Sequence, residues 1–375
     1  MNNRILTKRN TCRLCENSNI EVVFSLKSTP PANAFRKKKE IIDQQKKYPL
    51  NLMLCNNCGH AQLQEVLDPA ILFENYVYVS GTSKTFIQHF ERYAKEVISK
   101  FHLKKNNLIV EIGSNDGTLL KFFKDKDFRV IGIDPARSIA KTANKMGIET
   151  IPEFFNEKIS KQIMNREGHA DVIIANNVYA HIDDLKNLTI AIRKLLNKNG
   201  VFIFEVSYLI DVYKKTLFDT IYHEHLSYHT IKPLIKFFES LDMHLFDIKM
   251  VDTHGGSIRC YVQNSTGKKK NRISVNEALK VESKTKIFSP STFHHFSDSI
   301  EYLKNDLNHL IKNIRKNGMK IAGFGAPAKA TTLMHHFNIN SQHIDYIVDD
   351  SPFKQGLFTP GHNIPVVSSK YLKKE

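Results

Sequence analysis

The stretch LIVEIGSNDGTLL at residues 108–120 joins an apolar run to a short turn and then to the start of an amphipathic segment. The hydrophobic run ends at Glu111, and Gly113 and Gly117 permit a tight turn close to a ligand. A helix is expected from about Thr118. This order of strand, glycine turn and helix predicts the first unit of an α/β sheet that binds a ligand at its edge.

The same alternation continues along the chain. Short apolar runs at 107–113, 128–134, 170–177 and 201–207 alternate with amphipathic segments of helical period. Such runs are typical of parallel strands covered by helices on both faces, so they predict a doubly wound, Rossmann-like α/β domain. Residues 243–264 predict an antiparallel hairpin that closes the sheet.

The composition changes along the chain and predicts several parts. The expected segments are a small cysteine-bearing module (1–72), the central α/β domain (73–265), a linker and helix (266–317), and a smaller Rossmann-like α/β unit (318–375). The linker is expected because residues 265–286 are polar and basic. A helix from about Phe296 to Lys316 leads from it into the last unit.

Length and composition narrow the class of protein. The 375 residues are 41% hydrophobic and 25% charged, which excludes collagen-like, low-complexity and wholly disordered chains. The sequence contains no run of 18 apolar residues and no apolar core of a signal peptide near the start, so we expect a soluble cytoplasmic protein without membrane contact. The net charge of +16 is compatible with an anionic partner such as nucleic acid or a phosphorylated metabolite.

Four of the five cysteines form two C-x2-C pairs, Cys12 with Cys15 and Cys55 with Cys58. Four thiolates in two close pairs suit tetrahedral zinc, and such a closed site is structural because it leaves no position for a substrate. Two disulfides are disfavoured in a reducing cytosol, and a redox pair would need a surrounding βαβ pattern. Cys260 is expected to be a buried strand residue.

The glycine turn favours one cofactor over another. A dinucleotide site would be G-x-G-x-x-G, whereas this turn is G-x3-G and carries Glu111 and Asp116, which suit a pyrophosphate badly. The acidic groups instead suit the ammonium and sulfonium of S-adenosylmethionine. Asp134 ends the next strand, 21 residues after Gly113, where a carboxylate can accept hydrogen bonds from both ribose hydroxyls.

Several motifs in a fixed order resemble one family. They are EIGSNDG (111–117), GIDP (132–135), ANNVYAHIDDL (175–185), YHEHLSYH (222–229), THGGSIR (253–259) and GFGAPAK (323–329). Together with the double C-x2-C, they resemble the sugar C-methyltransferases of deoxysugar biosynthesis over nearly the whole chain. The resemblance implies a zinc module, an S-adenosylmethionine-dependent methyltransferase domain and a C-terminal Rossmann-like domain. It also implies a nucleotide-linked 4-keto-deoxysugar as substrate, methylated on carbon.

C-methylation needs a base that removes a proton beside a ketone and a donor to the enolate oxygen. By resemblance, we assign His225 as the base, Glu224 as its orienting or polar neighbour and Tyr222 as the donor, with His181 and Tyr76 completing the pocket. Judged by spacing alone, clustered histidines more often lie on the surface or are hydrogen-bonded in the core than act in catalysis, and Tyr76 is by default a residue that packs in the core. The run Y-H-E-H is not H-E-x-x-H, so it does not predict a metalloprotease.

Two further groups of residues are expected to hold ligands. The expected cofactor contacts are Glu111, Gly113, Ser114, Asn115, Asp116, Gly117, Asp134, Pro135, Phe155, Asn176 and Asn177. For the substrate's nucleotide diphosphate, we expect Gly323 and Gly325 of the second glycine loop, with Lys329 adding charge. A second dinucleotide site and a purely structural duplicate are the alternatives for this loop.

Other functions remain open at this point. The same cofactor loop would serve methylation of another small molecule at oxygen or nitrogen. The positive charge and the paired cysteines would suit a zinc-ribbon RNA-binding methyltransferase, although the basic residues are scattered and no aromatic RNA-binding motif accompanies them. The sequence leaves open the sugar, its nucleotide, the methylated carbon (C3 or C5) and the oligomeric state.

Overall fold

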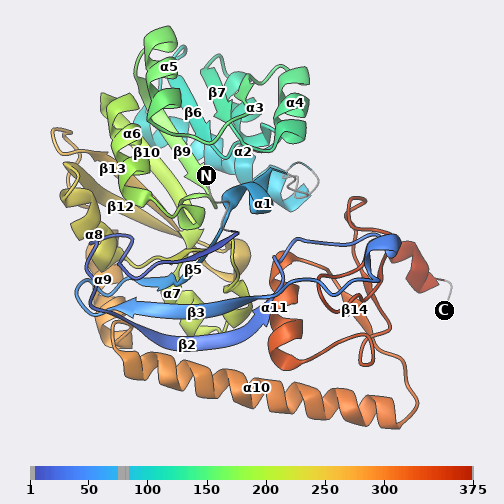
Figure 1. Ribbon diagram of the computed structural model, residues 1–375. Coiled ribbons are helices and arrows are strands. Elements are labelled where there is room, and N and C mark those ends of the chain that lie inside the picture. The colour runs from blue at the N-terminus through green and yellow to red at the C-terminus, as the bar shows by residue number, and fades with distance from the viewer. Residues whose placement is uncertain (1–4, 75–80, 82–83, 374–375) are drawn as a thin grey trace.

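The structure is a computed structural model of the chain and describes residues 5–74, 81 and 84–373. Tyr76, which we expected at the pocket, lies outside the described residues. Figure 1 shows a large central sheet, a smaller sheet formed mainly by the N-terminal segment, and a C-terminal α/β unit beside it. The long helix α10 (Pro290–Lys316) runs beneath the smaller sheet and leads to the C-terminal unit.

The central sheet has seven strands in the order β12-β13-β10-β9-β6-β7-β8. Their bounds are β6 Leu108–Ile112, β7 Arg129–Ile133, β8 Thr150–Ile151, β9 Ala170–Asn176, β10 Leu196–Ser207, β12 Met243–Val251 and β13 Ser257–Asn264. Strands β6, β7, β8, β9 and β10 are parallel to one another, whereas β13 is antiparallel to both β10 and β12. The predicted α/β sheet and its closing hairpin are thus confirmed.

Helices cover both faces of this sheet. They are α2 Lys84–Phe101, α3 Thr118–Lys124, α4 Arg137–Lys145, α5 Glu157–Glu167, α6 Leu185–Leu195 and α8 Ile231–Glu239. The short helix α7 (Leu209–Lys214) instead contacts the 3-10 helix η4 (Phe218–Thr220). Because successive strand residues point to opposite faces, Ile109 packs with α2 and α3, while Val110 belongs to the core formed with α5, α6 and α8. A continuous apolar run in each strand is therefore buried on both sides.

The N-terminal segment forms a four-stranded sheet in the order β11-β4-β3-β2. Its strands are β2 Ile20–Thr29, β3 Tyr48–Cys55, β4 Ala61–Leu63 and β11 Ser227–Tyr228, and beside it β1 Leu6–Lys8 pairs with β5 Glu65–Leu67, which is followed by α1 Pro69–Phe73. Strand β11 comes from the distant YHEHLSYH segment. The small module is therefore completed by a strand from the central part of the chain.

The C-terminal unit is a three-stranded parallel sheet, β14-β15-β16. Its elements are β14 Ala322–Phe324, α11 Ala328–Phe337, β15 Tyr346–Val348 and β16 Val366–Val367. Helix α11 packs against β2 and against the short 3-10 helix η4 (Phe218–Thr220). The unit is thereby joined to the N-terminal sheet and to the segment that precedes Tyr222.

The polar stretch 265–286, where we expected a boundary, contains helix α9 (Ile273–Thr285) packed against α8 and β12. Its Glu282 is buried and accepts hydrogen bonds from the backbone N–H groups of Ile231 and Lys232 and from the Tyr208 hydroxyl. Glu282 thus caps the N-terminus of α8, where free N–H groups and the helix dipole favour a carboxylate.

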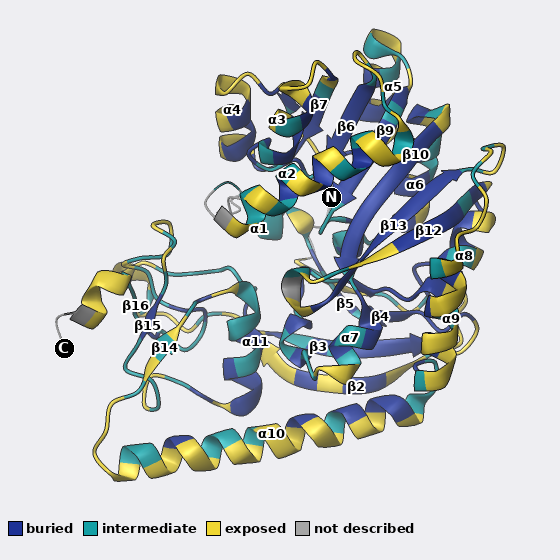
Figure 2. Cartoon of the chain, turned by 180° about the vertical axis from the view of Figure 1, so that it is seen from behind, coloured by how far each residue is buried: buried dark blue, intermediate teal, exposed yellow. Residues whose placement is uncertain are grey.

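The burial pattern separates the core from the periphery. Figure 2 shows the strands of the central sheet buried over most of their length, while α10 keeps one face exposed. Among the residues that the structure describes, no helix combines the length and the apolar character needed to cross a membrane.

The cap on α8 gives a stability prediction. Replacing Glu282 by alanine leaves two buried N–H donors without their acceptor, which should lower the free energy of unfolding by about 1–3 kcal/mol. Urea unfolding followed by circular dichroism measures this loss. Glu277→Ala, an exposed substitution in the same helix, is the control and should leave the midpoint unchanged. Equal midpoints for the two variants would contradict the capping role.

Candidate active site

A cavity of about 710 Å³ lies at the carboxyl ends of the parallel strands. Its walls come from the turns after β6, β7 and β9, from α1, from residues 220–226 and from the N-terminus of α11. Open α/β sheets bind ligands at this edge, and here all three parts of the molecule contribute to the wall.

The turn after β6 and its neighbours form one side of the cavity. The expected cofactor contacts that line it are Glu111, Gly113, Ser114, Asn115, Asp116, Asp134, Pro135, Phe155, Asn176 and Asn177. Gly117 does not line it. That residue begins α3 with φ 77°, and a Cβ there would lie 2.9 Å from the side chain of Ile148. Gly117 therefore shapes the turn through its backbone.

The turn is held tightly against β7. The N–H groups of Gly113 and Ser114 both donate to the Ile133 carbonyl, and a Cβ at Gly113 would lie 2.2 Å from Val178. The Asp134 carboxylate accepts from the N–H groups of Asn115 and Ala136, both at 2.9 Å. Each of its oxygens keeps a further lone pair, so Asp134 can still accept hydrogen bonds from ribose hydroxyls.

A buried carboxyl group lies beneath the turn. The Oε2 atom of Glu111 is buried and has no hydrogen-bond partner among the described residues. Burial raises the pKa of Glu111 well above its usual range, and the charges of Asp116 and Asp134 raise it further. A ligand with a positive group would lower that cost, so the residues fit the ammonium and sulfonium of S-adenosylmethionine.

Asp116 has a local structural role in addition to lining the cavity. One carboxylate oxygen accepts from the N–H and hydroxyl of Thr118, which caps the start of α3. The other accepts from the N–H of Gly81 at 2.9 Å.

Asn176, at the end of β9, accepts a hydrogen bond from Tyr93, and its buried Nδ2 has no partner among the described residues. That amide can therefore donate to a ligand.

Four rings stand in a row along the opposite wall. His225 lies 4.2 Å from Tyr222 and 5.1 Å from His181 between ring centroids, and His181 stacks on Phe73 at 5.5 Å. The Nδ1 atom of His225 lies 2.8 Å from the Thr220 carbonyl, which can only accept, so Nδ1 carries the proton. Nε2 therefore accepts from the Tyr222 hydroxyl, 3.0 Å away.

The other charged and imidazole groups of this segment lie behind the wall. Glu224 is buried and does not line the cavity. Its Oε1 accepts a hydrogen bond from Nδ2 of Asn33, and Asn33 lines the cavity. Burial lowers the pKa of His223 to about 4 and that of His229 to about 3. Of the three histidines in residues 222–229, only His225 lines the cavity. Sequence reasoning missed Asn33, because the proline-rich stretch 28–35 carries no functional motif.

The C-terminal unit contributes positive charge to the wall. Lys329 lines the cavity, with its Nζ 3.7 Å from Asp219, and so does Lys354, whose Nζ donates to the Ala326 carbonyl. Burial lowers the pKa of Lys354. Lys354 follows β15 in an irregular loop, and no motif in the sequence could have identified it.

The two glycines expected to bind phosphate do not line the cavity. Gly323 lies within β14, and the N–H of Gly325 donates to the Val348 carbonyl at 2.7 Å. The N–H of the next residue, Ala326, donates to the Asp349 carboxylate. The N-terminus of α11, rather than the glycine loop itself, borders the cavity.

The four N-terminal cysteines form one cluster away from the cavity. Their Sγ atoms all lie within 4.8 Å of one another, with Cys12 to Cys58 at 3.5 Å and Cys15 to Cys55 at 3.6 Å. Tetrahedral zinc with Zn–S bonds of 2.3 Å would place sulfurs about 3.8 Å apart, so the cluster fits this metal. With four sulfur ligands the site is closed, and the zinc is structural.

Asp134 offers a direct test of the cofactor site. Asp134→Ala removes the acceptor expected for the ribose hydroxyls, so calorimetry should show S-adenosylhomocysteine binding weakened by about 1–3 kcal/mol. Glu149→Ala, an exposed substitution near β8, should bind as tightly as the unchanged protein. Unchanged affinity in Asp134→Ala, or tighter binding of NAD than of S-adenosylmethionine and S-adenosylhomocysteine, would contradict the assignment.

The cysteine cluster predicts that one zinc ion per chain persists through purification. Cys55→Ser removes one of four ligands, and because metal binding contributes directly to folding in such sites, thermal stability should fall and zinc should be lost. Metal analysis and thermal unfolding measure both effects. Cys260→Ser changes a cysteine outside the cluster and should keep the zinc. Well-folded protein without zinc would refute the structural role.

Three sequence models of known domains match the chain in succession. A zinc-binding domain matches residues 12–73, a methyltransferase domain 86–247 and a C-methyltransferase C-terminal domain 252–375. The C-methyltransferase NovU of Streptomyces niveus is 33% identical over 357 residues, which cover 95% of this chain and 85% of that protein.

Two solved methyltransferase structures each match about half of this chain. Magnesium protoporphyrin IX methyltransferase from Synechocystis with bound SAH is 13% identical with a TM-score of 0.38, covering 48% of this chain and 83% of that one. An S-adenosylmethionine-dependent methyltransferase from Clostridium acetobutylicum is 16% identical with a TM-score of 0.39, covering 48% and 92%. At these TM-scores the likeness adds nothing to the assignment, which rests on the sequence matches.

The order of the matched domains agrees with the cysteine cluster, the seven-stranded sheet and the C-terminal α/β unit. The cofactor is S-adenosylmethionine, and the enzyme transfers its methyl group. The similarity to NovU extends over almost the whole chain, including the segment that carries His225. The chain therefore belongs to the C-methyltransferase family.

Proposed function

We propose that this enzyme methylates a carbon beside the ketone of a nucleotide-linked 4-keto-deoxysugar. The observation that carries the proposal is that one cavity is lined by the cofactor turn, by the Tyr222–His225 pair and by the lysines of the C-terminal unit. These three groups correspond to the needs of the reaction: a methyl donor, a base for a carbon-bound proton and a site for an anionic nucleotide.

His225 is suited to remove the proton. Because its Nδ1–H donates to the Thr220 carbonyl, the lone pair of Nε2 is directed elsewhere and can accept a proton from carbon. The C–H electron pair then forms the enolate double bond, and the carbonyl π electrons move to oxygen. The imidazolium that results keeps its Nδ1–H on Thr220, which stabilises the new positive charge.

Tyr222 is suited to stabilise the enolate oxygen. Burial raises the pKa of Tyr222 well above its usual range, so the phenol keeps its proton at neutral pH. Its hydroxyl donates to His225 in the structure, and with a ketone bound it would donate to the carbonyl oxygen instead, which releases Nε2 for its role as base. S-Adenosylmethionine, when bound, would supply the electrophilic methyl group to the enolate carbon, with the electron pair of the broken C–S bond remaining on S-adenosylhomocysteine.

The lysine-bearing end of the cavity supports a nucleotide diphosphate. The N-terminus of α11, a helix of ten residues, borders the cavity at Pro327 and Ala328, and Lys329 and Lys354 lie beside it. Helix N-termini favour anions through free N–H groups and the helix dipole, and two ammonium groups add to this effect. A phosphorylated substrate would therefore enter with its sugar toward His225.

Methylation at oxygen or nitrogen would use the same cofactor turn but would not require removal of a carbon-bound proton. Proton exchange therefore separates the two chemistries. With a panel of nucleotide-linked 4-keto-sugars in D2O, we expect the proposed enzyme to exchange the proton beside the ketone and to consume S-adenosylmethionine. Methyl transfer without any such exchange, and without a deuterium effect on the rate, would contradict C-methylation through an enolate.

His225→Ala should lower turnover by a factor of about 10² to 10⁴, the range expected for loss of a general base, with the affinity for S-adenosylhomocysteine unchanged. His223→Gln is the matched control two residues away. His223 does not line the cavity, and a glutamine at this position can still donate to the Pro49 carbonyl that His223 Nε2 contacts. The turnover of His223→Gln should therefore equal that of the unchanged enzyme. Full activity in His225→Ala would refute its role as base.

A further inference from the structure

The cysteine module contacts both segments that carry the stacked histidines. Strand β11 begins two residues after His225, and its Ser227 and Tyr228 pair with Gln62 and Ala61 of β4. The N–H of Leu63 also donates to the carbonyl of Leu226 at 3.0 Å. The module therefore fixes the position of the His225 segment through backbone hydrogen bonds.

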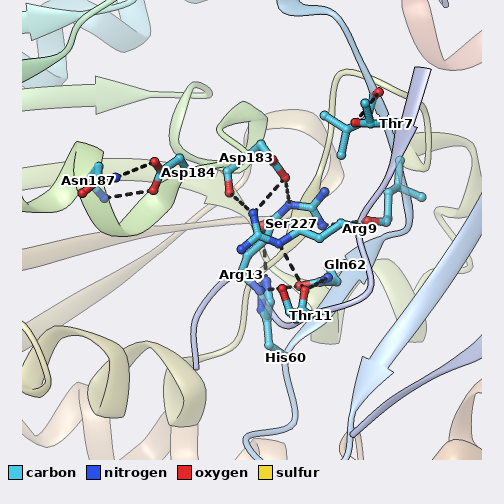
Figure 3. Close-up of polar contacts among 12 residues, drawn as sticks. Thr7, Arg9, Thr11, Arg13, His60, Gln62, Asp183, Asp184, Asn187 and Ser227 are labelled. Atoms are coloured by element: carbon cyan, nitrogen blue, oxygen red, sulfur yellow. Dashed lines mark hydrogen bonds and ion pairs between the residues drawn. The ribbon is translucent and has the colours of Figure 1, made fainter. Parts of the chain in front are cut away.

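Arg13 connects the module to the other histidine segment. It lies between Cys12 and Cys15 in the first cysteine turn, and its side chain is completely buried. Its Nε donates to the carboxylate of Asp183 at 2.9 Å (Figure 3). Its Nη1 donates to the carbonyl of Leu63 at 2.6 Å. One guanidinium thus joins the cysteine turn, strand β4 and the loop before α6.

The backbone of the cysteine turn is fixed from the same strand. The Gln62 side chain accepts from the N–H of Arg13 at 2.7 Å and donates to the carbonyl of Thr11 at 3.0 Å (Figure 3). Both sides of the turn are therefore tied to β4. A guanidinium anchored in this way has little freedom, so its position can determine that of its partner.

Asp183 belongs to the loop that carries His181 into the cavity. The 3-10 helix η3 (Tyr179–His181) ends two residues before it, and the Asp183 carbonyl accepts a further hydrogen bond from Arg9 at 3.0 Å. The N–H of Leu226 donates to the carbonyl of Ala180. The same loop thus contacts the His225 segment directly and the cysteine module through Arg13 and Arg9.

The contribution of the Arg13–Asp183 ion pair to the stability of the fold does not by itself explain why the Arg13 guanidinium is buried. Its Nη2 atom is buried and makes no hydrogen bond among the described residues, so part of the cost of desolvating the guanidinium is not compensated. Asp183 is 40% exposed, so water weakens its attraction for the guanidinium. Buried ion pairs often contribute no more stability than apolar residues of similar size, but they do define geometry. The arrangement therefore points to a role in positioning.

We propose that Arg13 is a positioning residue that holds the His181 loop, through Asp183, at the place where His181 stacks on His225. The inference rests on the proposed role of His225 in catalysis. Because the cysteine turn supplies the fixed end of this connection, the metal module sets the relative position of the two imidazoles. A displacement of about 1 Å in such a site can lower turnover by a factor of about 10².

Arg13→Gln removes the charge and the reach of the guanidinium. We expect it to keep one zinc per chain and an affinity for S-adenosylhomocysteine within about twofold, while kcat falls by a factor of about 10 to 100. The NMR ring signals of His181 and His225 should shift, because each ring lies in the ring current of the other, and that of His309 on α10 should not. Arg13→Lys, which retains one of the two contacts, should recover part of kcat.

Lys186→Ala is the matched control. Lys186 also joins the module to the central domain, through Glu16, but both side chains are exposed, so its loss should change neither kcat nor the ring signals. Asp183→Ala removes the acceptor and should lower kcat and shift the ring signals at least as far as Arg13→Gln does, because it also ends the ion pair of Asp183 with Arg9. The double variant should be no worse than the more severe single one, since both changes break the Arg13–Asp183 connection.

Several results would overturn the proposal. They are wild-type kcat with unmoved ring signals in Arg13→Gln, zinc loss that accompanies the loss of activity, and additive losses in the double variant. If Arg13→Gln does not fold, Asp183→Ala decides, and unmoved signals of His181 and His225 there refute the proposal. If the unchanged enzyme methylates none of the keto-sugars, the proposed substrate fails, whereas the ring signals still test the positioning role.

Discussion

The pairing of β4 with β11 is the constraint on which the active site depends. These two short strands come from residues 61–63 and 227–228, and they add the end of the segment with Tyr222 and His225 to the sheet of the cysteine module. The segment with Tyr222 and His225 is therefore not an ordinary loop of the central domain. Its position depends on a module whose own fold depends on the metal-binding cysteines.

The C-terminal unit is tied to the same segment. The hydroxyl of Thr331 in α11 donates to the Ala32 carbonyl, and that of Thr332 donates to the Ile221 carbonyl, both at 2.9 Å. Helix α11 thus contacts the residue before Asn33 and the residue before Tyr222. The three parts meet around one cavity, which explains why a structural metal, a methyl-donor site and a lysine-bearing helix occur together in one chain.

The sequence predicts the parts of the site that lie within one local motif. The turn 111–117 and Asp134 follow from the alternation of buried strands and helices, and all the expected cofactor contacts except Gly117 line the cavity. Arg13, Asn33 and Lys354 could not be predicted, because contacts between distant segments bring them to the site. The polar and basic composition of residues 265–286 predicts a boundary, whereas the structure places helix α9 there. The composition is polar because the helix buries few apolar side chains and one carboxylate, Glu282.

The central claim is that the metal module holds the segment that carries Tyr222 and His225, and hydrogen exchange with and without the metal tests this claim most directly. The N–H of Leu63 donates to the Leu226 carbonyl, and the N–H of Leu226 donates to the Ala180 carbonyl. After zinc is removed by a chelator, these two amides should exchange faster, while the amides of β6 and β9 stay protected. Unchanged protection at Leu226 would contradict the account. Equal loss of protection in β6 and β9 would also contradict it, because the metal would then hold the whole fold rather than this segment.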